Sequence, residues 1–301
     1  PCSCATTASC GTISVVDALE QIDRRYSCRL YSDRTLSGEH REALAAVMAE
    51  RSTGPLGSAV RFGLIAATPG DASALRRLGT YGFIEGATAY IVGAVRKGPK
   101  DLEDFGCLLE EVILHATALG VATCWLGGSF TRTSFTSRFG GVARDEIMPA
   151  VVAAGYPADD GGVARIRART EGTRRFPPSE LFFREEFGRP LDLADAGGYA
   201  DALHAVRMAP SATNKQPWRI VRLGDDWHFY LVRTRWYGRR SPFFLLLRIA
   251  DLQRVDLGIA MCHFALVARQ GGLPGRWVVD DPGAATPGPG VEYVVTWRAG
   301  A

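Results

Sequence analysis

The sequence predicts an α+β protein built from two fused, homologous halves that pack against each other as an intrachain pseudo-dimer. Three observations support this fold class. Helix-like and strand-like stretches alternate along the chain, their order restarts after a Gly-, Arg- and Pro-rich connector at 159–178, and two long apolar helices share one internal spacing. Since each half carries one such helix, we expect the halves to pack around a pseudo-two-fold axis, as the subunits of a homodimer do.

The repeat is clearest in the two long helices, each of which begins near an Asp-x-Gly sequence. After the aspartate come an apolar helix, a second glycine and a tryptophan, at identical distances in the two halves. The matching residues are Asp104, Gly120 and Trp125 in the first half and Asp256, Gly272 and Trp277 in the second. Two coincident spacings favour a duplication, which would place an interface site between the halves of one chain.

Composition and charge fit a globular protein that binds small molecules. A chain of 301 residues with 47% hydrophobic and 22% charged residues can bury a large core. The net charge of +3 is too small to favour a nucleic-acid partner, and no apolar run is long enough to cross a membrane. The first residues lack the basic and apolar segments of a signal peptide. We therefore expect a cytoplasmic protein that binds neither nucleic acid nor a membrane.

The apolar periodicity of the first half predicts an ordered series of helices and strands. Helices are expected at 13–26, from an N-cap at Ser37 onward, and at 104–119, and strands at 60–66, 89–95 and 150–154. Ser37 is a suitable N-cap because its hydroxyl can accept a hydrogen bond from a free backbone N–H of the first turn.

The second half repeats this pattern. A helix is expected from Tyr199, a second at 256–269, and strands at 218–223, 227–232 and 291–297. We therefore predict a flexible, Cys-rich tail at 1–12, a first half at 13–178 and a second half at 179–301.

The seven cysteines do not form an evident disulfide framework. Cys2, Cys4 and Cys10 lie close together in the tail and leave open a metal or iron–sulfur site, although their spacing matches no standard motif. Cys107, Cys124 and Cys262 lie in apolar surroundings and are expected to be small core residues.

The loop at 209–218 is the most distinctive local sequence of the chain. It combines two prolines, several hydroxyl and amide side chains and Trp218 between a predicted helix and a predicted strand. Because proline fixes φ, and Ser, Thr and Asn bind nearby backbone, we expect a rigid loop suited to a polar, planar heteroaromatic ligand. An ordinary helix-to-strand turn is the alternative.

Three features together resemble the FMN-dependent nitroreductase family. They are the Arg-x-Ser-x-Arg segment at 25–29, the Pro-Ser-x-x-Asn-x-Gln-Pro-Trp loop at 210–218, and the two Asp-x-Gly helices that lead to a tryptophan. Their arrangement in one chain is similar to the tandem branch labelled TM nitroreductase. The resemblance covers about 13–298, and the proline loop is its most specific part.

The resemblance implies an α+β dimer that binds one FMN at each of two interface sites. The residues carried over are Arg25, Ser27, Arg29 and Arg175 on the ribityl phosphate, Leu126, Gly127 and Gly128 at flavin N5 and O4, and Pro210, Ser211, Ala212 and Asn214 beside the isoalloxazine ring. Gln216 of the same loop is also counted among the cofactor-binding residues. Arginine suits a phosphate dianion because it offers forked, permanently charged donors. Glycine permits a close backbone approach to the ring.

The two halves differ at these positions. The stretch that matches the proline loop, 50–57, has no Asn and no Gln-Pro-Trp, and the stretch matched to Arg-x-Ser-x-Arg, 182–187, carries acids that would repel a phosphate. After the second helix, Gly275-Arg276-Trp277 replaces the Trp-Leu-Gly-Gly order. We therefore predict one FMN per chain and one vestigial site.

The resemblance implies an FMN-dependent NAD(P)H oxidoreductase in which hydride passes through flavin N5 to an electron-poor acceptor such as a nitroaromatic, a quinone or a flavin. No catalytic side chain and no metal ligand are expected, because the flavin carries the chemistry. The alternatives are a flavin-binding or sensing protein with little turnover, and a metal or iron–sulfur protein that uses the tail cysteines. We expect the fused chain to be a monomer; the sequence leaves open the acceptor and the choice between NADH and NADPH.

Overall fold

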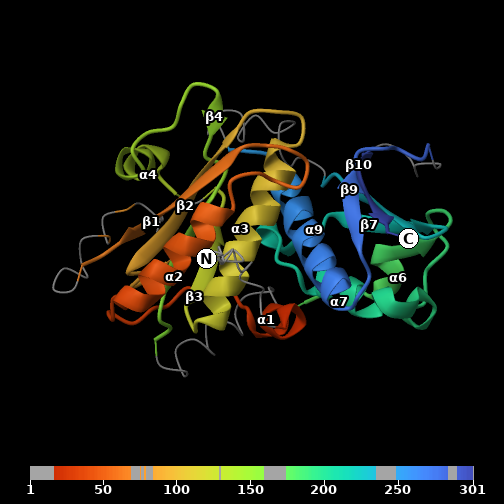
Figure 1. Ribbon diagram of the computed structural model, residues 1–301, viewed down its shortest axis with the longest axis horizontal. Helices are drawn as coiled ribbons and strands as arrows, with labels where there is room; N and C mark the ends of the chain where they lie inside the picture. Colours follow the sequence, from red (N-terminus) through yellow and green to blue (C-terminus); the bar gives the residue numbers. More distant parts are fainter. Residues whose placement is uncertain are drawn as a thin grey trace, which may run out of the picture.

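Two mixed layers of helix and sheet meet at a central pair of long helices (Figure 1). The computed structural model describes residues 17–68, 75, 78, 84–128, 130–158, 174–234, 249–283 and 290–300. The predicted tail at 1–12, with Cys2, Cys4 and Cys10, lies outside the described residues.

The first half contains a sheet with the strand order β1-β2-β5-β3, and β4 pairs with β2. Its elements are α1 (Ala18–Arg24), α2 (Gly38–Glu50), β1 (Val60–Ala66), β2 (Ala89–Arg96), α3 (Asp101–Ala118), β3 (Ala122–Leu126), α4 (Arg132–Arg138), β4 (Glu146–Ile147) and β5 (Val151–Gly155). Each of these strand pairs is antiparallel.

The second half contains a sheet with the strand order β6-β7-β8-β10-β9. Its elements are α6 (Pro178–Leu181), β6 (Phe182–Arg184), the 3-10 helix η2 (Leu193–Tyr199), α7 (Ala200–Met208), the 3-10 turn η3 (Ala212–Asn214), β7 (Trp218–Leu223), β8 (Asp226–Val232), α9 (Leu252–Gln270), β9 (Gly275–Val278) and β10 (Val291–Ala299).

The two sheets repeat one topology. β1, β2, β5 and β3 have the same order as β7, β8, β10 and β9, and a long helix precedes the last-placed strand in both halves. The additional strand β6 runs parallel to β7 at the outer edge of the second sheet. The sequence analysis matched this region to the Arg-x-Ser-x-Arg segment, but Ser27 instead pairs with Thr123 of β3, at the opposite edge of its sheet. That match was wrong.

Most expected elements are present with small shifts at their ends. The strands at 60–66 and 218–223 have the predicted bounds, and Ser37 caps α2 by accepting a hydrogen bond from His40 N at 3.1 Å. The helices α3 and α9 begin a few residues before the expected Asp104 and Asp256. The sequence analysis missed β3, β9 and α4, which are short elements without a long apolar pattern.

α3 and α9 cross in close contact at two glycines. A Cβ atom on Gly106 would collide with the carbonyl oxygen of Val255, and one on Gly258 would collide with the carbonyl oxygen of Glu103. Counted from Asp104 and Asp256, Glu103 and Val255 are themselves counterparts, so the contact is reciprocal, as expected at a two-fold interface. This crossing holds the two halves together in one molecule.

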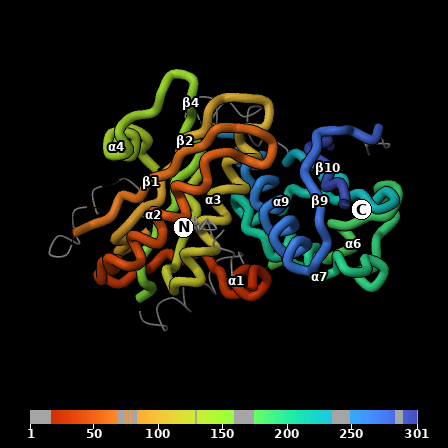
Figure 2. Tube along the Cα trace, viewed as in Figure 1, coloured from red at the N-terminus to blue at the C-terminus, as the bar shows by residue number. Residues whose placement is uncertain are grey.

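The first half also reaches across this interface through α1. That helix packs against α3 of its own half and against α7 and α9 of the other (Figure 2). The Ala18 backbone N–H donates to Gln270 Oε1 at 2.8 Å, at the far end of α9. These contacts fix the position of the segment that follows α1, beginning at Arg25, at the interface between the halves.

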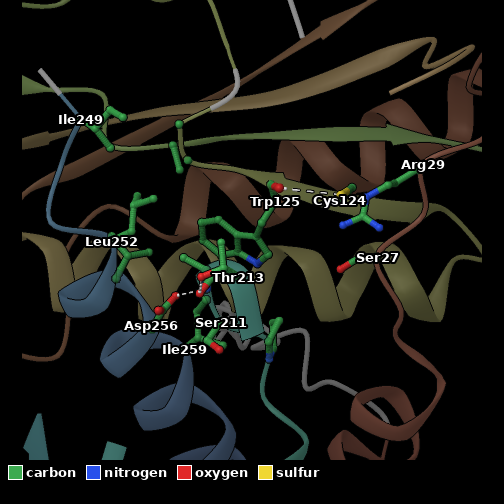
Figure 3. A pocket seen from close by; sticks show the side chains of 16 residues that line it. Ser27, Arg29, Cys124, Trp125, Ser211, Thr213, Ile249, Leu252, Asp256 and Ile259 are labelled. Atoms are coloured by element: carbon green, nitrogen blue, oxygen red, sulfur yellow. Dashed lines mark hydrogen bonds between the residues drawn. The ribbon is translucent and has the colours of Figure 1, made fainter. Parts of the chain in front are cut away.

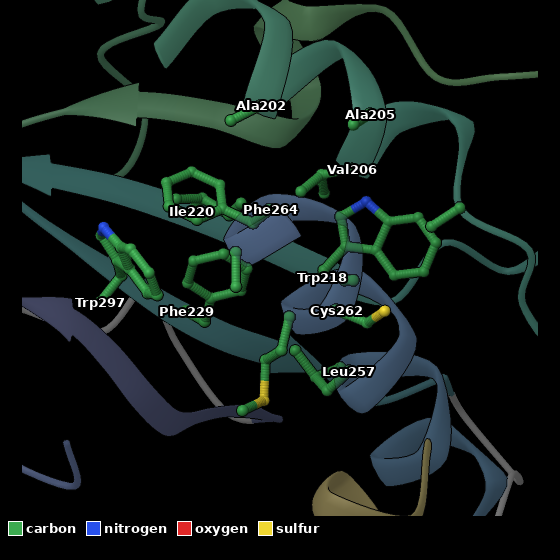
Figure 4. Packing of buried hydrophobic residues seen from close by; sticks show 14 of the residues in the cluster. Ala202, Ala205, Val206, Trp218, Ile220, Phe229, Leu257, Cys262, Phe264 and Trp297 are labelled. Carbon is green, nitrogen blue, oxygen red and sulfur yellow. The ribbon is translucent and has the colours of Figure 1, made fainter. Parts of the chain in front are cut away.

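The core of the second half is built around aromatic side chains on α9 and its sheet (Figure 4). Phe264 of α9 lies edge-on to Phe229 of β8, with ring centroids 5.4 Å apart, and edge-on to Trp297 of β10 at 5.8 Å. Among the described helices, none is both long and apolar enough to cross a membrane.

Candidate functional site

A cavity of about 560 Å³ lies between the two halves, beside the crossing of α3 and α9. This is within the usual range for small-molecule sites, about 300–1,000 Å³. It brings together seven of the predicted site residues, from both halves: Ser27, Arg29, Gly127, Gly128, Pro210, Ser211 and Ala212. The other five predicted residues lie behind this first layer, at positions described below.

The cavity has a cationic end and an apolar end. Arg29 and Ser27 lie on one side of Trp125, and Leu252 and Ile249 lie on the other (Figure 3). The cationic end is fixed by β3, since Cys28 N donates to Thr123 O at 2.9 Å. Its polarity suits an elongated ligand with an anionic group at one end and an apolar ring at the other.

Two further arginines lie near this cationic end without lining the cavity. Arg25 is buried, and its Nε lies 3.5 Å from Glu110 Oε1. Arg175 donates to Asn214 Oδ1 at 3.2 Å and to the Met208 carbonyl at 3.1 Å. Burial, together with the charges of Arg25 and Arg207, lowers the pKa of Arg175 to about 10. A cluster of like charges of this kind favours an anion.

The proline loop owes its shape to two of its predicted site residues. Gln216 N donates to Ser211 Oγ at 2.8 Å, and Gln216 Oε1 accepts from Phe176 N at 2.9 Å. Asn214 Nδ2 donates to Arg174 O at 2.8 Å. These bonds support the uncommon positive φ of Thr213, Asn214 and Gln216. Asn214 and Gln216 therefore shape the loop, and their contact with a cofactor stays a prediction.

The segment after β3 forms a wall that has little side-chain volume. The Leu126 side chain is buried in the first-half core, so only its backbone is available to a ligand. A Cβ on Gly127 would lie 2.5 Å from Leu252 Cδ1, whereas one on Gly128 would approach Ile249 no closer than 3.4 Å. Gly127 is thus required by the packing of α9, and Gly128 leaves space at the cavity.

Glu110 organises a buried polar network whose members come from both halves. Its carboxylate accepts from Trp125 Nε1 at 2.8 Å and faces His263 Nε2 at 3.1 Å. His263 Nδ1 faces the Ala205 carbonyl at 2.8 Å, so both ring nitrogens face oxygen atoms. Burial alone would raise the pKa of Glu110, but His263 and Arg25 outweigh it and hold that pKa below its ordinary value.

This network connects the helix crossing to the cavity wall. Trp125 lines the cavity, and Arg25 lies directly after α1, so Glu110 fixes both an aromatic wall and a cation. Sequence could have raised the possibility, since an acid on an apolar helix face is unusual. Its partner His263, however, lies more than 150 residues away in the other half.

The counterpart position on the other side of the pseudo-two-fold axis is filled by charged side chains. Counted from the two aspartates, Lys100 and Glu103 correspond to the cavity residues Leu252 and Val255. Arg254 donates to Glu103 Oε2 at 2.5 Å and to Asp101 Oδ1 at 3.0 Å, and Lys100 Nζ donates to Val294 O at 2.7 Å. An ion-pair cluster thus stands where the first site has apolar walls.

One group of possible metal ligands occurs among the described residues. Cys107, Glu111 and Cys262 each place a ligand atom within 4.8 Å of the others. Burial raises the pKa of the Cys262 thiol well above its ordinary value, and Glu111 is paired with Arg51 at 2.6 Å. Since the Glu111 carboxylate is already paired, we propose no metal here.

The fold and the cavity define an α+β protein of two homologous halves with a small-molecule site at their interface. Comparison with known families agrees with this class. Residues 17–268 match the family described as "Putative TM nitroreductase", and the chain belongs to that family. It is therefore a member of the nitroreductases, which are oxidoreductases. No curated protein matches the sequence.

One solved structure shows the same fold over the whole chain, and two others are similar to part of it. A protein from Thermotoga maritima, described as a putative nitroreductase, is similar over 98% of each chain, with a TM-score of 0.57 and 18% identity. A protein from Desulfovibrio desulfuricans, described in the same words and solved with FMN, matches 58% of this chain and 98% of its own, with a TM-score of 0.43 and 22% identity. An FMN and NADPH-dependent nitroreductase from Sphingopyxis matches 49% of this chain and 91% of its own, with a TM-score of 0.37 and 18% identity.

Proposed function

We propose that the protein is an FMN-dependent NAD(P)H oxidoreductase that holds one FMN between its two halves and reduces an electron-poor acceptor. FMN is named for the similar proteins from Desulfovibrio desulfuricans and Sphingopyxis, and NADPH for the latter. Family membership and the cavity support carrying both to this chain. When bound, FMN supplies the hydride chemistry at N5, and the protein supplies position and electrostatics.

The residues of the cavity fit this cofactor. At the cationic end, Arg29 and Ser27 would bind the phosphate, with Arg25 and Arg175 adding positive charge. At the other end, Leu252 and Ile259 offer apolar surface to the ring, while Gly128 leaves room for it.

The observation that carries the proposal is that this combination occurs on one side of the pseudo-two-fold axis. The other side holds the ion pairs of Arg254 with Glu103 and Asp101. We therefore propose one FMN per chain and a monomer, since both halves of the site belong to the same polypeptide. We also propose that 13–178 and 179–301 are the two nitroreductase-like halves.

The shape of the site supports a range of electron acceptors rather than one. The cavity wall formed by Pro210, Ser211, Ala212 and Thr213 faces apolar residues of α9, and a flat electron-poor molecule suits the space over a ring. Nitroaromatics, quinones and free flavins share this chemistry, so we propose them as the acceptor class. NAD(P)H would occupy the same space before the acceptor, which gives ping-pong kinetics.

Anaerobic reduction tests the proposal. Protein reconstituted with FMN should bleach at the flavin absorption bands on addition of NADH or NADPH and regain its colour with a quinone or nitroaromatic. Bound flavin that neither donor bleaches would indicate a binding or sensing protein. A brown protein without flavin bands would favour the iron–sulfur alternative at the tail cysteines.

A further inference from the structure

Asp256 is a buried carboxyl group in the wall of the cavity. It lies in the second turn of α9, is 3% exposed and has the apolar lining residues Leu252, Val255 and Ile259 as helix neighbours. In the sequence, Asp256 stands out only as the counterpart of Asp104 in the internal repeat. Its surroundings indicate a further role in the site.

The hydrogen bonding of Asp256 is incomplete. Oδ1 accepts from the backbone N–H of Ala212 in the proline loop at 3.0 Å. Oδ2 is buried and has no hydrogen-bond partner among the described residues. A buried polar atom without a partner is destabilising, and a bare ionised oxygen is more so. The described residues thus leave this oxygen open to a further hydrogen-bond partner.

Asp104, the counterpart in the first half, has no such deficit. Its Oδ1 accepts from Leu56 N at 2.8 Å and its Oδ2 accepts from Ser58 N at 2.8 Å. The two loops are therefore held by counterpart aspartates. The first loop donates to both carboxylate oxygens of Asp104, whereas the second donates to one oxygen of Asp256. The oxygen without a partner, Asp256 Oδ2, thus belongs to the half whose loop lines the cavity.

The charges around Asp256 favour its acid form. On its own helix, Asp251 adds negative charge, and the loop residues at 211–213 are not ionisable. On α3, Glu103 is paired with Arg254. Across the cavity, burial raises the pKa of Cys124 to about 11, so this thiol is neutral, and Arg29 lies at the cationic end. Burial and the Asp251 charge raise the pKa of Asp256 well above its ordinary value, although the Ala212 N–H opposes this rise.

We propose that Asp256 holds a proton on Oδ2 and donates a hydrogen bond from that atom to an uncharged oxygen or nitrogen acceptor of the heteroaromatic ligand in the cavity. The identification of this ligand as FMN rests on the proposed function, whereas the protonation does not. A donor at this point favours a ligand with an acceptor there and rejects one with a second donor, because two donors would both stay unpaired. Asp256 is thus a specificity-determining residue.

Infrared spectroscopy of the ligand-free protein tests the protonation. At pH 7 the wild-type protein should show the carbonyl band of a protonated carboxylic acid, and Asp256→Asn should lack it. Asp104→Asn is the matched control and should keep the band, as long as it folds. If it does not fold, the comparison of Asp256→Asn with the wild type still assigns the band. Absence of the band from the folded wild type at pH 7 would overturn the proposal.

Unfolding by urea gives a second readout of the same proton. A raised folded-state pKa means that the folded protein holds more protons than the unfolded chain, so stability is complete below the unfolded carboxyl pKa and falls as pH rises above it. The Asp256 contribution should lower the folding equilibrium constant about tenfold per pH unit in this window. Asp256→Asn should remove this slope; a slope equal to that of the wild type would contradict the proposal.

FMN titration tests the hydrogen bond to the ligand. In Asp256→Asn the amide oxygen must face the Ala212 N–H, so its NH₂ group points toward the cavity and replaces the donor. We expect FMN affinity within about threefold of wild type for Asp256→Asn and roughly tenfold weaker binding for Asp256→Ala, which lacks the donor. Equal affinity for wild type and Asp256→Ala, or a tenfold loss in Asp256→Asn, would overturn the donation. If the wild type binds no FMN, the proposed function fails and so does the donation to FMN, while the infrared band still decides the protonation.

Discussion

The two sides of the pseudo-two-fold axis hold different chemistry on the same backbone. On one side the first turns of α9 present Leu252 and Val255 to a cavity, and Gly127 leaves room for Leu252. On the other side, Leu252 and Val255 are replaced by Lys100 and Glu103, which make polar contacts. The counterpart of Gly127 there is the exposed Val279. The difference teaches that helix crossing and site chemistry are separable, since the crossing glycines are shared and the lining residues are not.

The same contrast extends to the tryptophans that end the two repeats. Trp125 Nε1 donates to Glu110, but Trp277 Nε1 is buried without a partner among the described residues. The counterpart of Glu110 is Cys262, which offers no carboxylate. Only Trp125 is therefore held in place by a charged group, and it is the one that lines the cavity.

Removing Glu110 should have the largest effect. Glu110→Ala leaves His263 and Arg25 buried without their carboxylate and should lower the free energy of unfolding by about 3–5 kcal/mol. Because the pKa of Glu110 is held down in the folded state, its contribution exists above the ordinary carboxyl pKa and is lost as pH falls through the folded value. Urea unfolding between neutral and acid pH measures both effects. Glu111→Ala, at the next residue but half-buried, is the matched control and should cost less.

Reversing charge at the cationic end should come next. Arg29→Glu replaces a donor to the phosphate with a repelling carboxylate and should weaken FMN binding by roughly a hundredfold or more. Quenching of flavin fluorescence on titration with protein gives the affinity. The matched control is Arg184→Glu, at the exposed last residue of strand β6, which should bind as the wild type does. Unchanged flavin retention in Arg29→Glu would remove the phosphate assignment.

Alanine substitutions at the two crossing glycines should destabilise the protein equally, whereas substitutions at the two sites should not have equal effects. Gly106→Ala and Gly258→Ala each force a Cβ against a carbonyl of the other helix, at a cost of about 1–3 kcal/mol of unfolding free energy. Thermal or urea unfolding measures the loss. Gly38→Ala, where a Cβ meets no atom, is the control. A large difference between the two variants would show that the crossing is not reciprocal.

Grafting one residue from the side with the ion pairs should have the smallest effect. Gly127→Val introduces the side chain found at its counterpart Val279, pushes on Leu252, and should weaken FMN binding about tenfold through strain of order 1–3 kcal/mol. Gly128→Ala, whose Cβ has an ordinary distance of 3.4 Å to Ile249, should bind nearly as well as wild type. The full stoichiometry should remain one flavin per chain in the wild type; a ratio near two would break the comparison of the two sides.

Sequence predicted the fold through features that are local or regularly spaced. The strands at 60–66 and 218–223 are apolar runs with clear ends, and the spacing from Asp104 to Trp125 repeats from Asp256 to Trp277. α4 was missed because Phe135 is its only buried residue, which leaves no apolar stripe to recognise. β3 and β9 are too short to show a period.

The candidate site was predictable in its members but not in their roles. Short motifs located Ser27, Gly128 and Ser211, and the structure brings them to one cavity. The roles of Asp256 and Glu110 depend on which oxygen atoms find partners, and these partners come from other elements. No pattern along the chain records that one oxygen of Asp256 stays unused while both oxygens of Asp104 are bonded.

The close crossing of Gly106 and Gly258 has a consequence for how this protein can change by mutation. In a true homodimer one gene position would supply both glycines and both sites, so every substitution would strike twice. Here each position is encoded separately, and a change at Lys100 or Glu103 leaves Leu252 and Val255 untouched. The fused chain can therefore keep a scaffold of two-fold symmetry while the residues at one of its two sites change by mutation.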